Sequence, residues 1–432
     1  MPALTRPTFL LRLYGGLATV LCPLAYARVK AKLRLHNIDP KRFSERMGYA
    51  SLPRSEGRVI WFHAASVGES LSVLRLIEEM GSALPDAHFL LTSGTATSAE
   101  IVARRLPPRT QHQFAPLDSA RAVARFLDHW RPDAGVFVES ELWPNMLRGA
   151  AARGVPLALI NARISDRSAQ NWTRAAGTAR NIMGLFRVIH TQDARTERHL
   201  RGLGLKHAKM GHNLKSFAAP LPVDEDALRA MQGAFLDRPL WVFSSSHPGE
   251  EEIALRAHAA LLASHPDLLL ILVPRHPERG ADIARLITAR GMSLARRSLG
   301  GMPGKDETVF LADTLGETGL WYRLSPIVCL GGSFTPVGGH NPYEPAHCSA
   351  AILHGPLYSN FIGVYAELHR AKAALEVQDA DALGQAVGRL LSSADTLTHL
   401  QSASADFAAA QADALGEMAH DLCATLELAP PP

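Results

Sequence analysis

Residues 331–346 read GGSFTPVGGHNPYEPA and directly follow a short apolar run, IVCL, at 327–330. A short apolar run bounded by turn residues predicts a buried strand, so this strand ends in a glycine-rich loop. Glycine lets the backbone approach a ligand closely, because it has no Cβ atom. The next residues, Asn341 and Pro342, predict a helix start with the asparagine as N-cap and the proline in the first turn. The stretch is typical of the strand, loop and helix unit of an α/β fold.

The composition of this glycine loop (Gly331, Gly332, Gly338 and Gly339) suits an anionic ligand. Exposed backbone N–H groups and the positive end of a helix favour a phosphate or a carboxylate. Glu344 could accept hydrogen bonds from a ribose. The spacing matches neither the G-x-G-x-x-G nor the Walker motif. An ordinary turn between strand and helix explains the loop equally well.

Length and composition indicate a folded protein with room for two α/β domains, since the chain has 432 residues and is 47% hydrophobic. The net charge of +4 is unevenly placed: residues 1–50 carry nine Lys and Arg against two acidic residues, a net +7, which leaves −3 for the remainder. This distribution argues against a nucleic-acid-binding surface and for a basic, membrane-facing N-terminus. The four cysteines show no C-x-x-C spacing, which indicates reduced thiols in the cytoplasm.

The N-terminal segment, residues 1–35, is predicted to associate with a membrane. Residues 8–27 (TFLLRLYGGLATVLCPLAYA) are about as long as a spanning helix, but they contain Arg12 and Pro23. Four basic residues follow at 28, 30, 32 and 34, and these would stay with anionic headgroups on the cytoplasmic side. We expect a helix that either spans once or lies in the interface.

The remaining chain alternates between strand and helix patterns, which predicts two parallel, doubly wound sheets. We expect a first Rossmann-like domain at 36–215, a linker at 216–223, a second Rossmann-like domain at 224–395, and a C-terminal helix at 396–432 that returns toward the first domain. The ligands of such a fold bind beyond the carboxyl ends of the strands, so we expect a central cleft there. The predicted strands are 59–62, 88–92, 136–138, 157–160, 188–190, 208–211, 241–243, 268–273, 309–311, 327–330 and 351–353.

Several charged residues stand at predicted strand ends or at the domain boundary. Glu69 could act as a general base if it is partly desolvated, although a glutamate in a first helical turn also simply favours the helix dipole. Glu139 follows a strand, where it could equally be a structural loop carboxylate. Arg275 suits a phosphate or carboxylate, and Lys215 could reach a ligand from the hinge. A surface arginine and a linker lysine are the alternatives.

Two further loops, SSSHPGE at 244–250 and DTLGE at 313–317, carry hydroxyl or acidic groups after strands and could cradle a phosphate. His63, His247, His276 and His340 lack metal-ligand spacing, so we interpret them as hydrogen-bonding residues. No G-x-S-x-G motif is present.

Taken together, these motifs resemble the Kdo transferases, membrane-associated glycosyltransferases that move 3-deoxy-D-manno-oct-2-ulosonic acid (Kdo) from CMP-Kdo to the lipid A precursor in lipopolysaccharide synthesis. The resemblance runs from about Arg42 to past Tyr365. It rests on the ordered motifs HAASVGE, ELWPN, NARISDRS, GHNLK, HPGEE, LLLILVPRHPER, DTLGE and GGHNPYEPA.

The resemblance implies a GT-B fold and an inverting reaction with Glu69 as the general base, while Glu139 and Lys215 stabilise the transition state. It implies a place on the cytoplasmic face of the inner membrane, with CMP-Kdo, the lipid A precursor and the membrane surface as partners, and no cofactor or metal in the transfer step. The residues that match CMP-binding positions are Pro274, Arg275, Leu315, Gly316, Glu317, Asn341, Pro342, Tyr343 and Glu344.

Two other functions fit parts of the pattern. A cytosolic GT-B nucleotide-sugar epimerase would share the two-domain architecture, and its activity would not depend on residues 1–34. A non-catalytic scaffold that binds a nucleotide sugar or a lipid would tolerate the loss of Glu69.

Overall fold

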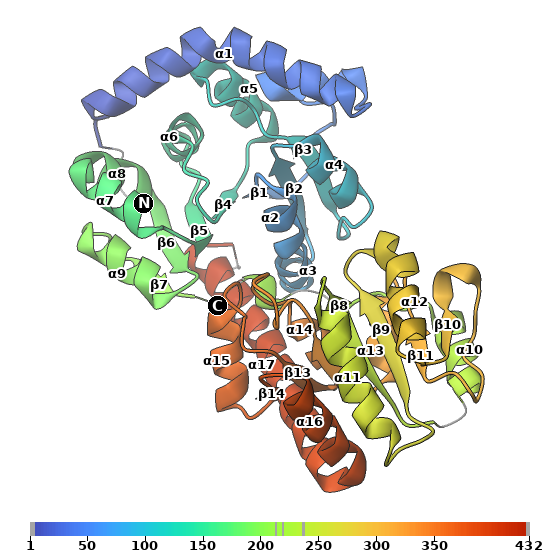
Figure 1. The fold of residues 1–432 in the computed structure, drawn as a ribbon. Helices are drawn as coiled ribbons and strands as arrows, with labels where there is room; N and C mark the ends of the chain where they lie inside the picture. Colours follow the sequence, from blue (N-terminus) through green and yellow to red (C-terminus); the bar gives the residue numbers. More distant parts are fainter. Residues whose placement is uncertain (1–4, 212–213, 218–219, 236–237, 429–432) are drawn as a thin grey trace. The chain divides into compact units, whose positions relative to one another are not determined.

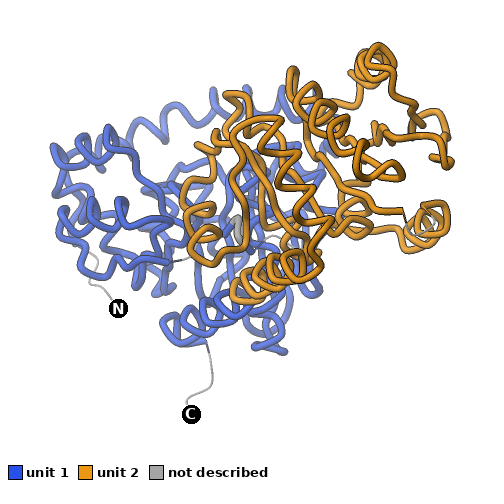
Figure 2. The backbone as a smooth tube through the Cα atoms, turned by 60° about the horizontal axis from the view of Figure 1, so that its bottom comes forward, with its two compact units in different colours: residues 1–218, 412–432 blue, residues 219–411 orange. Residues whose placement is uncertain are grey.

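The computed structural model describes residues 5–211, 214–217, 220–235 and 238–428. The chain divides into two compact units, one formed by Met1–Ala218 with Ala412–Pro432 and the other by Ala219–Gln411 (Figure 2). In the described residues each unit contains a seven-stranded parallel sheet, as the alternating pattern predicted. Residues 212–213 of the GHNLK motif and 218–219 of the predicted linker lie outside the described residues.

The sheet of unit 1 has the strand order β3-β2-β1-β4-β5-β6-β7. The chain winds outward from β1 in one direction and then returns to β4 on its other side, so β1 and β4 flank a topological switch point. The strands are β1 Arg58–His63, β2 Ala87–Ser93, β3 Thr110–Phe114, β4 Ala134–Val138, β5 Leu157–Ala162, β6 Phe186–Thr191 and β7 Ala208–Met210.

Both faces of this sheet are buried, which explains its nearly continuous apolar strands. In β1, Ile60 and Phe62 lie in one core cluster, whereas Val59 and Trp61 lie in the other. The helices of unit 1, with two 3-10 turns written η, are α1 Phe9–Leu35, η1 Pro40–Met47, α2 Val67–Ser72, α3 Leu74–Ala83, α4 Ala96–Ala103, α5 Ala120–Trp130, α6 Pro144–Ala152, α7 Asp166–Arg174, α8 Ala176–Met183, α9 Ala194–Gly202 and η2 Leu214–Phe217.

The sheet of unit 2 repeats this plan with the order β10-β11-β9-β8-β12-β13-β14, so its switch point lies between β8 and β12. The glycine loop follows β12, and the SSSHPGE loop starts within β8. Both predicted anion loops therefore stand at the switch point. The strands are β8 Leu240–Ser246, β9 Leu269–Pro274, β10 Leu294–Arg296, β11 Val309–Leu311, β12 Ile327–Leu330, β13 Ala351–His354 and β14 Ala374–Glu376.

Helices also cover both faces of the second sheet (Figure 1), with alternate residues of β9 in separate core clusters. They are α10 Glu225–Phe235, α11 Glu250–Leu262, η3 Pro277–Arg279, α12 Gly280–Ala289, η4 Arg297–Leu299, α13 Thr318–Leu324, α14 Tyr343–Ala346, α15 Ile362–Arg370, α16 Ala380–Ser392 and α17 Ala394–Thr425. The last helix begins in unit 2 and ends in unit 1, where Leu415, Met418 and Leu422 pack in the same core cluster as Ile60 and Phe62.

The N-terminal helix α1 lies along α5 and α6 of unit 1 (Figure 1). Leu11 and Cys22 bury their side chains there, Leu33 packs with Phe43 and Phe114, and Tyr14 Oη donates to Asp118 Oδ2 at 2.8 Å. Among the described helices, α1 alone is long and apolar enough to cross a membrane by length and composition. Its apolar outer face remains exposed, and it includes Phe9, Leu10, Leu13, Leu17, Val20, Leu21 and Leu24.

Candidate active site

Glu69 lies at the start of α2, directly beyond the carboxyl end of β1. Ser66 is the N-cap: its Oγ accepts from Glu69 N at 3.3 Å and donates to Glu69 Oε1 at 2.8 Å. The second oxygen, Oε2, accepts from Ala65 N at 2.8 Å. These hydrogen bonds hold a half-buried carboxylate in one orientation. Glu69 does lie in the first turn of α2, where its charge favours the helix dipole, and its hydrogen bonds leave each oxygen a further lone pair.

Two polar residues at neighbouring strand ends adopt left-handed backbone conformations. Glu139 follows β4 with φ of 57°, and Asn161 lies in β5 with φ of 53°. Such conformations are strained for residues with a Cβ and cluster at functional sites. Asn161 Nδ2 donates to Glu139 Oε1 at 3.4 Å, which aligns the two side chains.

Asn161 also connects this strand edge to the segment that contains Lys215. Its buried Oδ1 accepts from Leu214 N at 3.2 Å, at the start of η2, and η2 packs against α2. The backbone of η2 is thereby placed beside the helix that carries Glu69. The side chain of Lys215 lies outside the described part of the structure. Asn161 belongs to the NARISDRS motif, but no local pattern indicates that its amide links Glu139 to η2.

A second carboxylate, Glu141, completes this edge of unit 1. His63 Nε2, at the end of β1, lies 3.4 Å from Glu141 Oε2, and Trp143 Nε1 also donates to that oxygen. Burial acts to raise the pKa of Glu141, but the hydrogen bonds and charge of His63 and the bond from Trp143 prevail and lower it. His63 is therefore a hydrogen-bonding residue, as its sequence context predicted, with its Nδ1 3.0 Å from Thr92 Oγ1.

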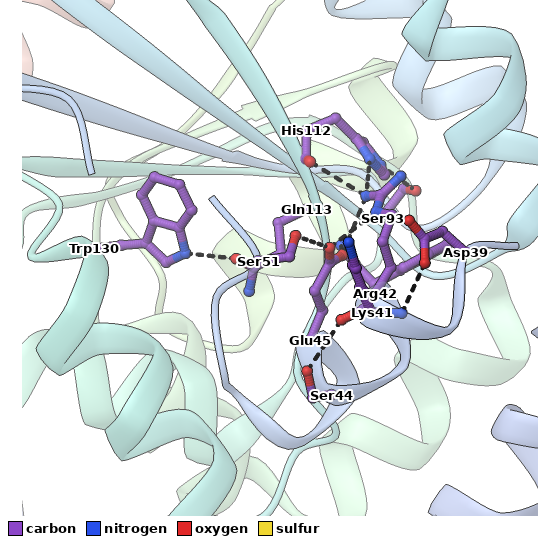
Figure 3. Close-up of polar contacts among 11 residues, drawn as sticks. Asp39, Lys41, Arg42, Ser44, Glu45, Ser51, Ser93, His112, Gln113 and Trp130 are labelled. Atoms are coloured by element: carbon purple, nitrogen blue, oxygen red, sulfur yellow. Dashed lines mark hydrogen bonds and ion pairs between the residues drawn. The ribbon is translucent and has the colours of Figure 1, made fainter. Parts of the chain in front are cut away.

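Behind this edge, a buried ion pair fastens η1 to the sheet (Figure 3). Glu45 is fully buried and accepts from Arg42 Nε at 2.8 Å, Arg42 Nη2 at 3.1 Å and Phe114 N at 2.7 Å, and also from Ser51 Oγ. Arg42 Nη2 also donates to His112 Nδ1 at 3.0 Å. Because a buried carboxylate requires several donors, the network fixes where the chain enters the sheet.

In unit 2, the glycine loop is organised by a carboxylate that the sequence did not single out. Glu250 is fully buried and accepts from Gly332 N at 2.7 Å, Phe334 N at 2.9 Å and His247 N at 2.9 Å. Gly331 N donates to Ser244 O at 2.7 Å. The expectation that these loop N–H groups are exposed for a ligand is therefore wrong, because the protein itself uses them.

The glycines have a conformational role instead. Gly332, Gly338 and Gly339 all have positive φ, and a Cβ on Gly332 would lie 2.8 Å from the His340 ring. The adjacent helix begins one residue later than predicted: α14 starts at Tyr343, and Pro342, not Asn341, occupies the N-cap position. Asn341 Oδ1 nevertheless accepts from Tyr343 N at 3.2 Å, so its capping hydrogen bond is present.

Two of the three hydroxyls of the SSSHPGE loop are used within the protein and not presented as part of the predicted phosphate cradle. Ser244 Oγ bonds to Tyr322 Oη at 2.8 Å and Ser246 Oγ donates to Glu251 Oε1 at 2.8 Å, and both serines are buried. They stabilise the core beneath the loop.

An arginine and three histidines gather at this loop edge, with Arg275 and His276 exposed and His247 and His340 half-buried. Arg275 follows Pro274, the last residue of β9, and is exposed. His247 Nε2 lies 3.0 Å from His340 Nε2 with the rings stacked, and His276 packs edge-on against His247. Burial, His247 and Arg275 together lower the pKa of His340 to about 4. We call Arg275, His247, His276 and His340 the basic cluster.

Two of the predicted nucleotide-binding positions are acidic. Burial raises the pKa of Glu344, which accepts from Asn341 Nδ2 at 3.4 Å. Glu317 instead pairs with Arg297 at 2.5 Å, and this hydrogen bond lowers its pKa. Two residues before Glu317, Leu315 is 79% exposed beside Gly316, whose φ is 83°. An exposed leucine on a tight turn offers an apolar surface to a flat ligand.

Sequence comparison identifies the family of the chain. The family model for 3-deoxy-D-manno-octulosonic-acid transferase matches residues 41–218. The transferase of Rickettsia bellii is 33% identical over 87% of this chain and 89% of its own length, and that of Haemophilus influenzae is 34% identical over 84% and 86%. The chain belongs to the Kdo transferase family.

As a Kdo transferase, the chain is a glycosyltransferase. A probable mitochondrial Kdo transferase of Arabidopsis thaliana is 33% identical over 92% of both chains. The fold is shared more widely. A glycosyltransferase from Rickettsia africae covers 87% of this chain with a TM-score of 0.57, at 11% identity. The UDP-GlcNAc 2-epimerase of Neisseria meningitidis covers 86% with a TM-score of 0.54, at 12% identity. These similarities establish the GT-B fold. The epimerase alternative is supported by this similarity in fold alone.

Proposed function

We propose that this Kdo transferase moves Kdo from CMP-Kdo to a sugar hydroxyl of the lipid A precursor, with Glu69 as the general base. The proposal rests on the arrangement around Asn161 and α2. The side-chain amide of Asn161 bonds to Glu139 and to the backbone of η2, and η2 packs against α2, the helix that holds Glu69. Glu69 follows β1 and Glu139 follows β4, the two strands that flank the switch point of this sheet, and α/β enzymes bind substrates at such points.

The reaction needs a base for the acceptor and stabilisation for the leaving group. The acceptor oxygen attacks the anomeric carbon of Kdo, its proton passes to Glu69, and the bond from that carbon to the phosphate oxygen breaks with its electron pair leaving on CMP. Attack opposite the leaving group inverts the anomeric configuration. A carboxylate that is already oriented by Ser66 and Ala65 does not have to be reorganised during the step.

We assign the leaving nucleotide to unit 2. Arg275 is exposed and has the donor geometry that matches a phosphate. The ring nitrogens of the basic cluster lie beside it. Leu315, Gly316 and Glu317 would hold the base or ribose, and Asn341 and Glu344 offer an amide and a carboxyl group to the ribose. Negative charge that develops on the phosphate is then stabilised by side chains, which agrees with a transfer step that requires no metal.

Glu139 and Lys215 have supporting roles in this scheme. The ammonium of Lys215, on η2, would stabilise the negative charge of the Kdo carboxylate or the departing phosphate. The strained backbone at Glu139 fixes its carboxylate relative to Asn161 and hence to η2. Loss of either side chain should lower the rate more than the affinity for the nucleotide.

The lipid acceptor requires the enzyme to work at a membrane surface. We propose that α1 lies in the interface on the cytoplasmic face of the inner membrane. Support comes from its packing along α5 and α6, with Leu13, Leu17 and Val20 exposed on its outer face. The basic residues that follow in sequence would attract anionic headgroups.

The test is transfer by purified protein incubated with CMP-Kdo and tetraacylated lipid A precursor in the presence of a chelator, with the lipid product followed by mass. We expect a gain of whole Kdo units for the parent protein. Glu69→Gln should transfer Kdo at least 100 times more slowly than the parent protein, while it still binds CMP. The matched control is Glu78→Gln, an exposed glutamate on the neighbouring α3. A Glu69→Gln variant with parental turnover would exclude this residue as the base.

A further inference from the structure

A pair of histidines and a glutamate meet at the edge of the second sheet, away from the basic cluster. His354 is the last residue of β13, Glu376 is the last residue of β14 and pairs with it across the strands, and His369 lies on α15, which connects them. One ligand atom from each of the three residues lies within 4.8 Å of the others. His354 Nε2 and His369 Nε2 are 2.9 Å apart, with the two rings stacked.

The protonation state of His354 is set by the backbone. Its Nδ1 lies 2.8 Å from Gly355 O, and because a carbonyl oxygen can only accept, Nδ1 carries the proton. The Nε2 atom therefore has a free lone pair that points toward His369. A ring N–H that donates to a backbone carbonyl is the arrangement that orients histidine ligands in metal sites.

The two imidazoles are close enough to share one small cation after a slight movement. Two nitrogens that each lie about 2.1 Å from a tetrahedral Zn²⁺ are roughly 3.4 Å apart, so the two Nε2 atoms, now 2.9 Å apart, separate by about 0.5 Å when the ion binds. His354 is fully buried, His369 is half-buried and Glu376 is exposed, so solvent reaches the group from the side of the carboxylate. Glu376 accepts from Tyr358 Oη at 3.0 Å and from Gln378 Nε2 at 2.8 Å, which hold its carboxylate beside the pair.

We propose that His354, His369 and Glu376 form a binding site for a borderline divalent cation, with Zn²⁺ as the best match. Two imidazoles exclude Mg²⁺ and Ca²⁺, which require oxygen ligands, whereas two histidines and a carboxylate are ligands that Zn²⁺ accepts. Without the ion, His369 Nε2–H donates to His354 Nε2. When the ion binds, His369 moves this proton to Nδ1, so both rings remain neutral and both Nε2 atoms are ligands.

The ion would join the last strand–helix–strand segment of unit 2. β14 is a three-residue strand at the sheet edge, and few hydrogen bonds hold it. One ion bound by His354 on β13, His369 on α15 and Glu376 on β14 would cross-link this segment. Tyr358 and Tyr365 pack around the same histidines, and Tyr365 Oη donates to His340 O at 3.3 Å, so the site lies beneath the glycine loop. The proposal concerns the stability of unit 2 and is independent of the transfer reaction.

The site is tested with tag-free, full-length protein that has been stripped with a chelator and titrated with Zn²⁺, and separately with Co²⁺ as an optical probe. We expect one tightly bound equivalent, Co²⁺ absorption bands typical of nitrogen and oxygen ligands, and a rise in the Tm of unit 2. His369→Ala should abolish all three effects. Glu376→Gln should weaken binding at least tenfold. Both side chains reach the surface, so these variants avoid emptying the core position of His354.

Two controls separate this site from other imidazoles. His399→Ala removes an exposed histidine on α17 outside the group and should leave binding unchanged. His340→Ala disrupts the other close histidine pair, His247 with His340, and should also leave binding unchanged. Loss of binding in His340→Ala with retention in His369→Ala would overturn the proposal, and so would the absence of a saturable equivalent in the parent protein.

Discussion

In unit 1, the carboxylate of Glu45 is fully buried. It accepts hydrogen bonds from two nitrogens of Arg42, from Ser51 Oγ and from Phe114 N (Figure 3). Glu45→Gln replaces one acceptor oxygen by a donor and leaves the guanidinium without its counter-charge. Breaking a buried pair on one side costs about 3 to 5 kcal/mol. We expect a loss of this size in unit 1, measured by amide hydrogen exchange during denaturation, which distinguishes the two units.

The exposed pair Arg75–Glu78 provides the comparison for Glu45. Glu78→Gln should change the free energy of unfolding by less than about 1 kcal/mol, because solvent screens such a pair. Equal losses in Glu45→Gln and Glu78→Gln would contradict the view that burial makes the Arg42–Glu45 pair important.

At the glycine loop, the backbone conformation of Gly332 can be tested by adding a single methyl group. Its φ is 65°, and a Cβ would lie 2.8 Å from Cδ2 and 2.9 Å from Nε2 of His340. Gly332→Ala therefore combines a strained backbone with displacement of His340 from the basic cluster. We expect CMP affinity to fall at least tenfold, measured by calorimetry, with unit 2 still folded.

The matched control for Gly332 is Gly363→Ala on α15, where an added Cβ meets nothing within 4 Å and φ is not positive. This variant should bind CMP like the parent protein. Unchanged CMP affinity in Gly332→Ala would mean that the loop conformation does not govern the nucleotide site.

At the scale of elements, the sequence predicted the apolar strands but missed the edge strands β3, β10 and β14. β3 reads TQHQF and β14 reads ALE, and neither has the apolar run that marks a buried strand. Both lie at sheet edges, where only one neighbour supports them. Their pairing depends on contacts distant in sequence, such as the bond from Phe114 N to Glu45, and a local pattern cannot contain that information.

Local sequence patterns also cannot show the long-range contacts of the candidate site. Glu69, Glu139 and Arg275 could be found because each follows a recognisable strand. The role of Glu250 could not, because it accepts from Gly332 and Phe334, which are more than 80 residues further along the chain. Asn161 is similar, since its partner Leu214 is 53 residues away.

The outer face of α1 yields a prediction about an element. Leu13, Leu17, Val20 and Leu24 lie at helical spacings of three and four residues and are all exposed. Burying this stripe in a lipid interface would be favourable, since each buried apolar side chain contributes about 1.5 to 3 kcal/mol. Leu17→Glu with Val20→Glu should therefore reduce binding to vesicles with anionic lipid by at least tenfold in a sedimentation assay.

The control for α1 is Leu299→Glu, because Leu299 is 76% exposed on unit 2. It should leave vesicle binding unchanged. The double variant should also keep its melting temperature, because neither position contributes to the packing of α1 on α5 and α6. Undiminished vesicle binding by the double variant would mean that another surface holds the enzyme at the membrane.

For the molecule as a whole, each unit contains a buried histidine that folding keeps neutral. Burial and the neighbouring Arg42 lower the pKa of His112 in unit 1 to about 3. Burial lowers the pKa of His258 in unit 2 to about 4, although its hydrogen bond to Thr308 O acts in the opposite direction. In an unfolded chain both would titrate near 6.5. Between these values the unfolded state binds more protons than the folded state, so both units lose stability as pH falls below about 6.5.

His258 allows this acid sensitivity to be removed from one unit. Its Nδ1 accepts from Trp241 Nε1 at 3.4 Å and its Nε2–H donates to Thr308 O at 2.8 Å, a pairing that only the neutral ring can satisfy. A glutamine also offers one acceptor and one donor but does not titrate near neutral pH.

The parent unit 2 should lose up to about 1.4 kcal/mol per pH unit from His258 as pH falls from 6.5 toward 4. In His258→Gln that slope should be smaller in unit 2 and unchanged in unit 1, where His112 remains. Denaturation at a series of pH values, followed by hydrogen exchange in each unit, measures both slopes. If the slope of unit 2 is the same with and without His258, the acid sensitivity of that unit arises from other groups.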